Sequence, residues 1–147
     1  MPNWCYNRVE IFGDDEELAK IKKQVETKES LFDFDTIIPT PNFDMIPNDK
    51  GELPKLRDDD IGKKLGVKEF PDGSQDDRWY DWHIDNWGTK WNSCDCAVED
   101  EGDVLRYVFN TAWGPPEPII CKLRELYPDV GTSAFYDEPG MEIAGYL

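Results

Sequence analysis

The segment from Arg78 to Trp91 holds four of the chain's six tryptophans and its only histidine. On a helix, its apolar side chains would cover an arc of roughly 200° and leave only a narrow polar stripe. Gly88 then follows as the expected left-handed helix end. A helix that is apolar over so much of its circumference has to be covered on more than one side. We therefore predict a helix over about 77–87 that packs in its own domain or against a partner.

Strand-like and helix-like patterns alternate along the rest of the chain. The strand patterns cover residues 4–12, 31–38, 90–98, 104–113, 132–136 and 142–146. The helical patterns cover about 15–27 and 117–127, and a short helix is expected near 59–65. Asp14, with Glu17 three residues on, is predicted to cap the first helix. Strand–helix–strand thus occurs twice, which is typical of an α+β, ferredoxin-like fold with two helices on one face of an antiparallel sheet.

The length of 147 residues indicates one domain with a sizeable core. Residues 42–77 are rich in Pro, Gly, Asp and Lys and show the weakest patterns. A connection this long inside a compact domain is usually functional or partly disordered. We expect a single ferredoxin-like domain over 1–147 with a helical insertion over about 42–90. The tryptophan helix is expected to cover the sheet face that the other two helices leave bare.

Acidic residues outnumber basic ones by 32 to 16, which gives a formal net charge of −16. This excess argues against nucleic acid or an anionic membrane as a partner, because such binding depends on neutralising phosphates. It also permits two interpretations, plain solubility or a surface that imitates DNA phosphates in a basic groove of another protein. The predicted partner-binding acids are Asp95, Glu99, Asp100, Glu101, Asp103, Asp137 and Glu138.

The tryptophan segment offers a second, weaker candidate surface. Its members are Trp79, Trp82, Trp87 and Trp91. Aromatic platforms that stack on bases also need interleaved Lys and Arg, and only Arg78 and Lys90 lie in this segment. Core packing is therefore the favoured interpretation, and partner contact is the alternative.

Catalytic and metal-binding motifs are absent from the sequence. Cys94 and Cys96 form Cys-x-Cys, which differs from the Cys-x-x-Cys of zinc sites. We expect no enzyme activity, no catalytic residue, no metal and no cofactor. A small-ligand or hydrolytic role around Tyr80, His83 and Cys94 stays open as an alternative.

Four segments carry a resemblance to a known family: Met-Pro-Asn-Trp-Cys-Tyr-Asn-Arg-Val at 1–9, Ile-Ile-Pro-Thr-Pro at 37–41, the tryptophan motif at 79–91 and Thr-Ala-Trp-Gly-Pro-Pro-Glu-Pro at 111–118. Together they resemble the YubB-type family of small plasmid- and phage-encoded proteins with a ferredoxin-like domain. The resemblance implies the fold and a mobile-element origin. It implies no reaction, because the family has no assigned molecular function.

These patterns predict a non-enzymatic, acidic accessory protein of a phage or other mobile element. We expect it to bind and inhibit a host nucleic-acid-handling or defence protein with a basic groove, as an anti-CRISPR protein or DNA mimic does. A structural or regulatory phage module without mimicry is the alternative. No apolar run approaches the length of a membrane span, and the start lacks the pattern of a secretory signal. We therefore expect no membrane partner, no direct binding of nucleic acid, and a place in the cytoplasm of an infected or plasmid-bearing bacterial cell.

Overall fold

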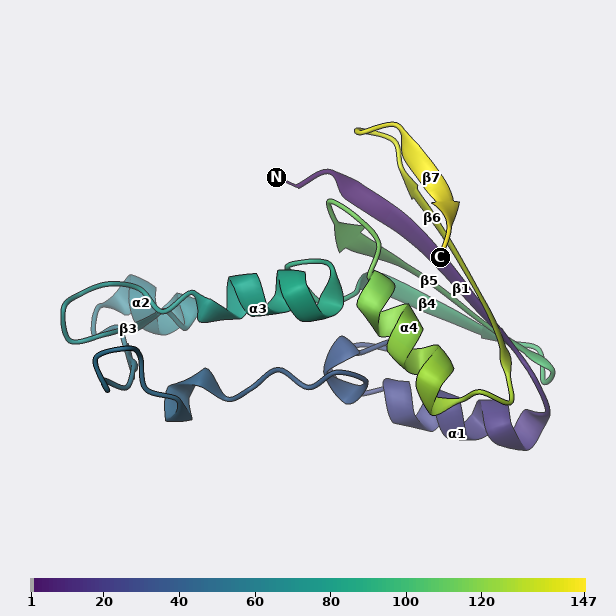
Figure 1. Cartoon of the computed structure of the whole chain (residues 1–147), viewed down its shortest axis with the longest axis horizontal. Helices are drawn as coiled ribbons and strands as arrows, with labels where there is room; N and C mark the ends of the chain where they lie inside the picture. The colour runs from purple at the N-terminus through teal and green to yellow at the C-terminus, as the bar shows by residue number, and fades with distance from the viewer. Residues whose placement is uncertain (1) are drawn as a thin grey trace. The chain divides into compact units, whose positions relative to one another are not determined.

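The computed structural model describes residues 2–147, which form two compact units (Figure 1). The sheet unit comprises residues 2–39 and 83–147, and the insertion unit comprises residues 40–82. The sheet unit contains β1 (Trp4–Phe12), α1 (Asp15–Val25), η1 (Phe34–Thr36), β4 (Cys94–Asp100), β5 (Val104–Ala112), α4 (Glu117–Leu126), β6 (Gly131–Glu138) and β7 (Ile143–Tyr146). The insertion unit contains η2 (Phe43–Met45), β2 (Lys55–Leu56), α2 (Asp60–Leu65) and β3 (Lys68–Glu69). Helix α3 (Arg78–Trp87) begins in the insertion unit and ends in the sheet unit.

The five strands of the sheet unit form an antiparallel sheet in the order β4-β5-β1-β6-β7. Along the chain, β1, α1, β4, β5, α4 and β6 follow the βαββαβ order of a ferredoxin-like fold, and β7 extends one edge. Helices α1 and α4 lie on the same side of this sheet (Figure 1). The predicted fold class is therefore confirmed.

Local sequence signals explain where the two covering helices begin and which faces they bury. The Asp14 carboxylate accepts from the backbone N–H of Glu17 at 2.9 Å and so caps α1, as predicted. Apolar residues at helical spacing then face the sheet and are buried. They are Leu18, Ile21 and Val25 in α1, and Ile119, Ile120 and Leu123 in α4.

The predicted strand over Leu31–Ile38 is wrong, because this segment forms a turn and the short helix η1. The carboxylate of Asp33 accepts from the backbone N–H of Asp35, from the Thr27 hydroxyl and from the side-chain amide of Asn92. These contacts curl the segment, since a carboxylate that bonds nearby backbone competes with strand pairing. Strand β4, after the insertion, takes the place of the second ferredoxin-like strand.

The core of the sheet unit is strongly aromatic on its helix side. Phe32 stacks on Phe109 with ring centroids 5.2 Å apart, and Phe34 meets Trp87 edge to face at 5.5 Å. The Trp87 indole N–H donates to the carbonyl of Ile38 at 2.8 Å. The buried end of α3 therefore packs among residues of the helix side. The expectation that this helix covers the opposite face is wrong.

The insertion unit has few buried apolar side chains and is organised around one arginine. The Arg78 guanidinium donates to both carboxylate oxygens of Asp76, at 2.8 and 2.9 Å, and to the carbonyl of Phe43 at 2.9 Å. It also lies over the rings of Phe43 and Phe70, 5.1 and 5.3 Å from their centroids. Burial and hydrogen bonding of this kind make Arg78 the central contact of the unit.

Candidate interaction surface

The sheet face opposite α1 and α4 stays exposed to solvent. Side chains alternate along β1, so Cys5, Val9 and Ile11 are buried while those between them point outward. Trp4 and Phe12, at the two ends of β1, are 39% and 43% exposed. We call this exposed side the open face. An exposed face with large aromatic side chains is typical of a binding surface.

Charges in the middle of the open face pair with one another. Arg106 in β5 donates to the carboxylate of Glu10 at 3.2 Å and to that of Glu99 at 2.8 Å. The Arg8 guanidinium lies 3.3 Å from Glu10 and over the ring of Phe135, 5.0 Å from its centroid. The centre of the open face is therefore nearly neutral, although the whole chain carries −16.

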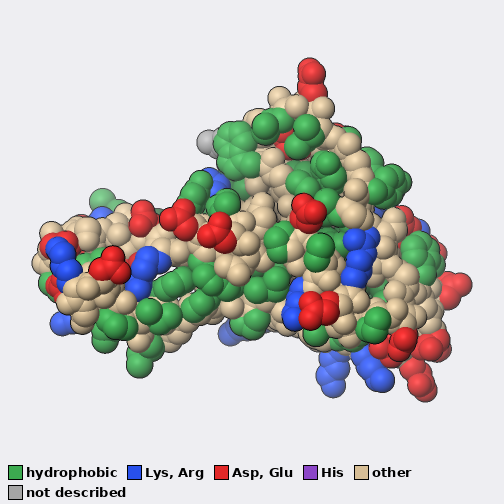
Figure 2. All heavy atoms as spheres, in the orientation of Figure 1, with side chains coloured by type: hydrophobic (Ala, Val, Ile, Leu, Met, Phe, Trp, Pro, Cys, Tyr) green, Lys and Arg blue, Asp and Glu red, His purple; other side chains and the backbone are tan. Residues whose placement is uncertain are grey.

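One end of the sheet collects carboxylates from three separate segments, and we call it the acidic end. The end of β1 lies beside the start of β5, with the backbone N–H of Gly13 donating to the carbonyl of Asp103 at 3.3 Å. The other edge of β1 pairs Phe12 with Gly131. The acidic end therefore comprises Asp14, Asp15, Glu16, Glu17, Glu99, Asp100, Glu101, Asp103 and Asp129. Figure 2 shows red side chains gathered over the start of α1 and the β4–β5 turn.

Three cations neutralise part of the acidic end. Lys22 pairs with Asp100 at 3.6 Å, Lys20 pairs with Glu17 at 3.8 Å, and Arg106 pairs with Glu99 and Glu101. Asp15, Glu16, Asp103 and Asp129 are exposed, and the part of the chain that the structure describes gives them no ion pair. Their uncompensated charge sets a negative potential at this end.

The predicted acidic residues do not form one surface. Glu99, Asp100, Glu101 and Asp103 lie at the acidic end. Asp95 lies in the bulge near the other end of β4, and Asp137 lies opposite Tyr6, toward the other end of β1. Glu138 is 1% exposed, and its carboxylate accepts from the backbone N–H groups of Gly140 and Met141. It shapes the β6–β7 turn and does not belong to a partner-binding surface.

The opposite end of the sheet collects tryptophans, and we call it the tryptophan end. The rings of Trp4 and Trp91 lie 6.1 Å apart, and Trp91 is 38% exposed. Trp113 follows the Ala112–Trp4 pair, is 46% exposed and has a φ of 70°. Left-handed backbone at so bulky a residue costs free energy, and such strain is common at functional sites. Figure 2 shows green side chains beside the N-terminal end of β1.

The predicted aromatic candidates separate into buried and exposed residues. Trp91 lies on the surface, whereas Trp87 is 1% exposed and contributes to the core. Trp79 and Trp82, in the part of α3 that belongs to the insertion unit, are half-buried. Trp4 and Trp113 were not predicted as surface residues of this cluster, because the local sequence does not indicate which residues lie next to a strand end in the sheet.

The small-ligand or hydrolytic role was predicted around Tyr80, His83 and Cys94, and two of these side chains make structural contacts. His83 stacks on Trp87 with ring centroids 3.8 Å apart, and burial lowers its pKa. Burial raises the pKa of Cys94, whose thiol points to the carbonyl of Asn92. Both shifts oppose the thiolate–imidazolium pair that nucleophilic cysteine chemistry needs. Tyr80, 43% exposed, lies in the insertion unit.

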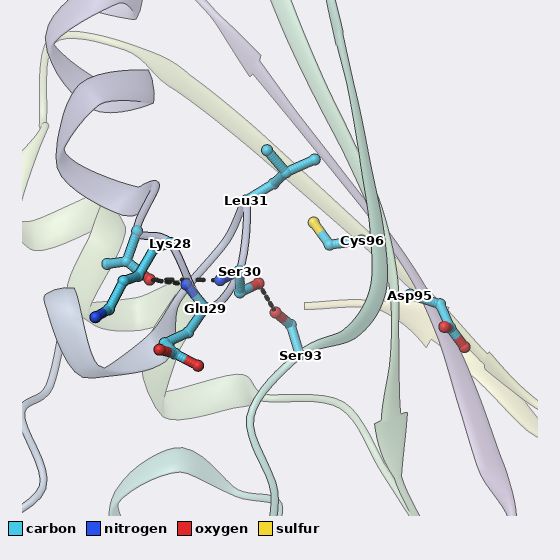
Figure 3. A pocket seen from close by; sticks show the side chains of 8 residues that line it. Lys28, Glu29, Ser30, Leu31, Ser93, Asp95 and Cys96 are labelled. Carbon is cyan, nitrogen blue, oxygen red and sulfur yellow. Dashed lines mark hydrogen bonds between the residues drawn. The ribbon is translucent and has the colours of Figure 1, made fainter.

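A hollow of about 310 Å³ opens between the α1–η1 loop and the start of β4 (Figure 3). The hydroxyls of Ser30 and Ser93 are hydrogen-bonded to each other at 2.8 Å, and the Asp95 side chain points away from them. Burial raises the pKa of the Cys96 thiol to about 11, which leaves it protonated and unreactive at neutral pH. Within residues 2–147, no group of three or more His, Cys, Asp or Glu is placed to hold a metal ion. None of the helices in this range is long and apolar enough to cross a membrane.

Comparison with known proteins supports the fold. Residues 86–147 match a family described as the ferredoxin-like domain in Api92-like protein. The crystal structure of protein Api92 from Yersinia pseudotuberculosis is similar, with a TM-score of 0.60 and 15% sequence identity. The similarity covers 99% of this chain and 93% of that chain. At this identity the likeness shows the fold alone. The sequence matches no curated protein.

Proposed function

We propose that this protein works by binding another protein, with its acidic end docked against a basic, nucleic-acid-binding groove of that partner. The supporting observation is the acidic end itself, where the fold joins Asp14–Glu17, Glu99–Asp103 and Asp129. Eight of its nine carboxylates are exposed, and five of these exposed carboxylates have no ion pair among residues 2–147. Such a surface attracts a basic partner over distance and repels nucleic acid.

The sheet unit carries most of the charge that this proposal needs. It has 21 acidic and 9 basic side chains, a net charge of −12, while the insertion unit has 11 and 7, a net charge of −4. The carboxylates of the acidic end can occupy the positions at which a basic groove normally binds phosphates. By occupying the groove, the protein would inhibit its partner without any chemical step.

The resemblance to YubB-type proteins extends the proposal to its biological setting. A protein encoded by a mobile element is present in the same cell as host nucleases and CRISPR effectors, which bind nucleic acid in basic channels. We place the protein in the cytoplasm of the cell that carries the element, where these targets work. The same inhibition would then protect the element from the host's defence.

The test is capture of host proteins by two charge-reversed variants. The first replaces Asp15, Glu16 and Asp103 by Lys, which reverses unpaired carboxylates at the acidic end. The control replaces Asp49, Asp60 and Asp81, which are also exposed but lie in the insertion unit. Asp60 and Asp81 lie in first helical turns, as Asp15 and Glu16 do, so the helix-dipole cost is matched.

We expect wild type and control to retain one nucleic-acid-binding protein from host lysate at 50 mM salt, and the first variant to lose it. Double-stranded DNA or guide-bound RNA should compete for the same site, and 500 mM salt should release it. A partner that binds equally well at 50 and 500 mM salt, or that binds DNA at the same time, would contradict the proposal. In that case the acidity serves solubility alone.

A further inference from the structure

The loop of residues 88–93 is held firmly on both sides of Trp91. The buried Thr89 hydroxyl donates to the last carbonyl of β5 at 2.9 Å. The Asn92 side-chain carbonyl accepts from the backbone N–H of Phe34 at 3.0 Å. Gly88, at φ 81°, fits closely against the start of α4, because a Cβ there would lie 2.9 Å from Pro118. A loop fixed this well nevertheless leaves its largest side chain, Trp91, 38% exposed.

The buried half of the tryptophan motif supports this loop. His83 lies flat on Trp87, and its Nδ1 is 2.7 Å from the backbone carbonyl oxygen of Lys90. A carbonyl only accepts, so Nδ1–H donates this hydrogen bond, which fixes the imidazole tautomer. The pKa of His83 is lowered by burial, which keeps the ring neutral at neutral pH. The stack thereby sets the position of Lys90 and of the exposed tryptophan beside it.

The exposed aromatic pair already holds one cation. The Lys90 ammonium lies over the Trp91 ring, 4.2 Å from its centroid, and Trp4 contacts the same tryptophan. Among residues 2–147, Lys90 forms no ion pair with a carboxylate. In a chain of net charge −16, this lysine is held by an aromatic ring. The contact is the geometry of cation–π binding.

We propose that Trp4 and Trp91 form a binding site for a lysine or arginine side chain of the partner, and that this side chain displaces the Lys90 ammonium. The inference rests on the proposed function, since it requires a basic protein partner. Charge favours this occupant over an anionic one, because the carboxylate of Asp137 lies at this end of the sheet, opposite Tyr6 and two residues along β1 from Trp4. A rigid, preformed aromatic site binds with little loss of side-chain entropy.

A short peptide serves as the probe, so the test needs no identified partner. The peptide acetyl-Gly-Arg-Gly-Arg-Gly-amide is added to the full-length, ¹⁵N-labelled protein at 500 mM salt. The indole N–H signals of all six tryptophans are followed by NMR. The matched control peptide carries citrulline for arginine, which keeps the shape and removes the charge. We expect the arginine peptide, and not the citrulline peptide, to shift the signals of Trp4 and Trp91.

Two variants test the displacement of Lys90. Lys90→Met keeps the chain length and removes the internal cation, and we expect it to strengthen arginine-peptide binding about two- to fivefold, the factor of one exposed cation–π contact. Trp91→Ala should abolish the shift at Trp4, while the remaining spectrum reports an intact fold. Equal shifts with the two peptides, no shift at either tryptophan, or weaker or unchanged binding by Lys90→Met would each overturn the inference.

The acidic-end variant separates this inference from the proposed function. With Asp15, Glu16 and Asp103 replaced by Lys, long-range attraction is lost, but at 500 mM salt the peptide should still shift Trp4 and Trp91. Peptide shifts at both tryptophans, together with a wild-type protein that captures no nucleic-acid-binding partner, would place the fault in the proposed function. A lost aromatic shift in a protein that still captures its partner would place it in the inference on the tryptophans.

Discussion

Arg78 should decide whether the insertion unit is folded. Its guanidinium makes two hydrogen bonds to the 5%-exposed carboxylate of Asp76 and lies on two aromatic rings. A hydrogen bond to a charged group contributes about 1.5–3 kcal/mol. Removing one partner also leaves a buried carboxylate unpaired, at a cost of about 3–5 kcal/mol. We expect Arg78→Met to lower the free energy of unfolding of the insertion unit by about 3 kcal/mol, the low end of this range, because the guanidinium is partly exposed.

Native-state hydrogen exchange measures this loss unit by unit. The backbone amides of Arg57 and Asp76 bond to carbonyls within the insertion unit, at 2.8 Å each. In Arg78→Met these amides should exchange roughly 100-fold faster, the factor for about 3 kcal/mol, while amides of β1 keep their protection. Arg57→Met is the control, because within residues 2–147 the exposed Asp59 is the only ionic partner of Arg57. Unchanged exchange in Arg78→Met would refute the central role of this arginine.

The same contact makes the insertion unit sensitive to acid. Hydrogen bonds from Arg78 hold the pKa of Asp76 below its usual range. A carboxylate with a lowered folded-state pKa stabilises the fold above its ordinary pKa, and this stabilisation is lost as pH falls through the lowered value. We therefore expect the Asp76 amide to lose protection below pH about 4 in the wild type. Arg78→Met should show little of this pH dependence.

Three further predictions concern the sheet unit. Tyr107→Phe should leave the melting temperature unchanged or raise it, because the buried hydroxyl has no hydrogen-bond partner among residues 2–147 to lose; a fall of several degrees would mean that the hydroxyl is bonded. Gly88→Ala should lower the free energy of unfolding, measured by urea denaturation, by about 1–2 kcal/mol, because φ is 81° and the new Cβ would clash with Pro118. Unchanged stability would show that the loop can shift to make room for the methyl group. Iodoacetamide at pH 8 should label the exposed Cys121 well before Cys96, whose pKa is raised to about 11 by burial. Mass spectrometry measures both labelling rates, and equal rates would contradict the burial of Cys96.

Patterns with a local cause were predicted correctly from the sequence. The alternation in β1 and the cap at Asp14 each depend on residues close together, and both are confirmed. The segment 31–38 shows the same alternation, yet its conformation depends on the contact between Asp33 and Asn92, 59 residues away. No local pattern reports such a partner. The helical arc of the tryptophan motif likewise did not show that only Trp87 would be buried.

The candidate surface was only half predictable for the same reason. Glu99–Asp103 is acidic in sequence and lies at the acidic end, but the first turn of α1 joins it only through the pairing of β1 with β5. Helix starts favour acids in any protein, so Asp15 and Glu16 carried no sign of a shared surface. Glu138 looked like one more surface acid, and only the turn at Gly140 and Met141 explains its burial.

The distance between the two ends of the sheet gives each a separate part in binding. Trp4 and Phe12 are eight residues apart on β1, which spans about 26 Å at the usual rise per residue. This exceeds the screening length of about 8 Å at physiological salt, so charge at the acidic end contributes little at the tryptophans. Exposed charges mainly change association rates, whereas buried aromatic anchors mainly change dissociation rates. A partner that covers both ends should therefore associate more slowly with the acidic-end variant and dissociate faster from Trp91→Ala. A partner that contacts one end alone would show only one of these effects.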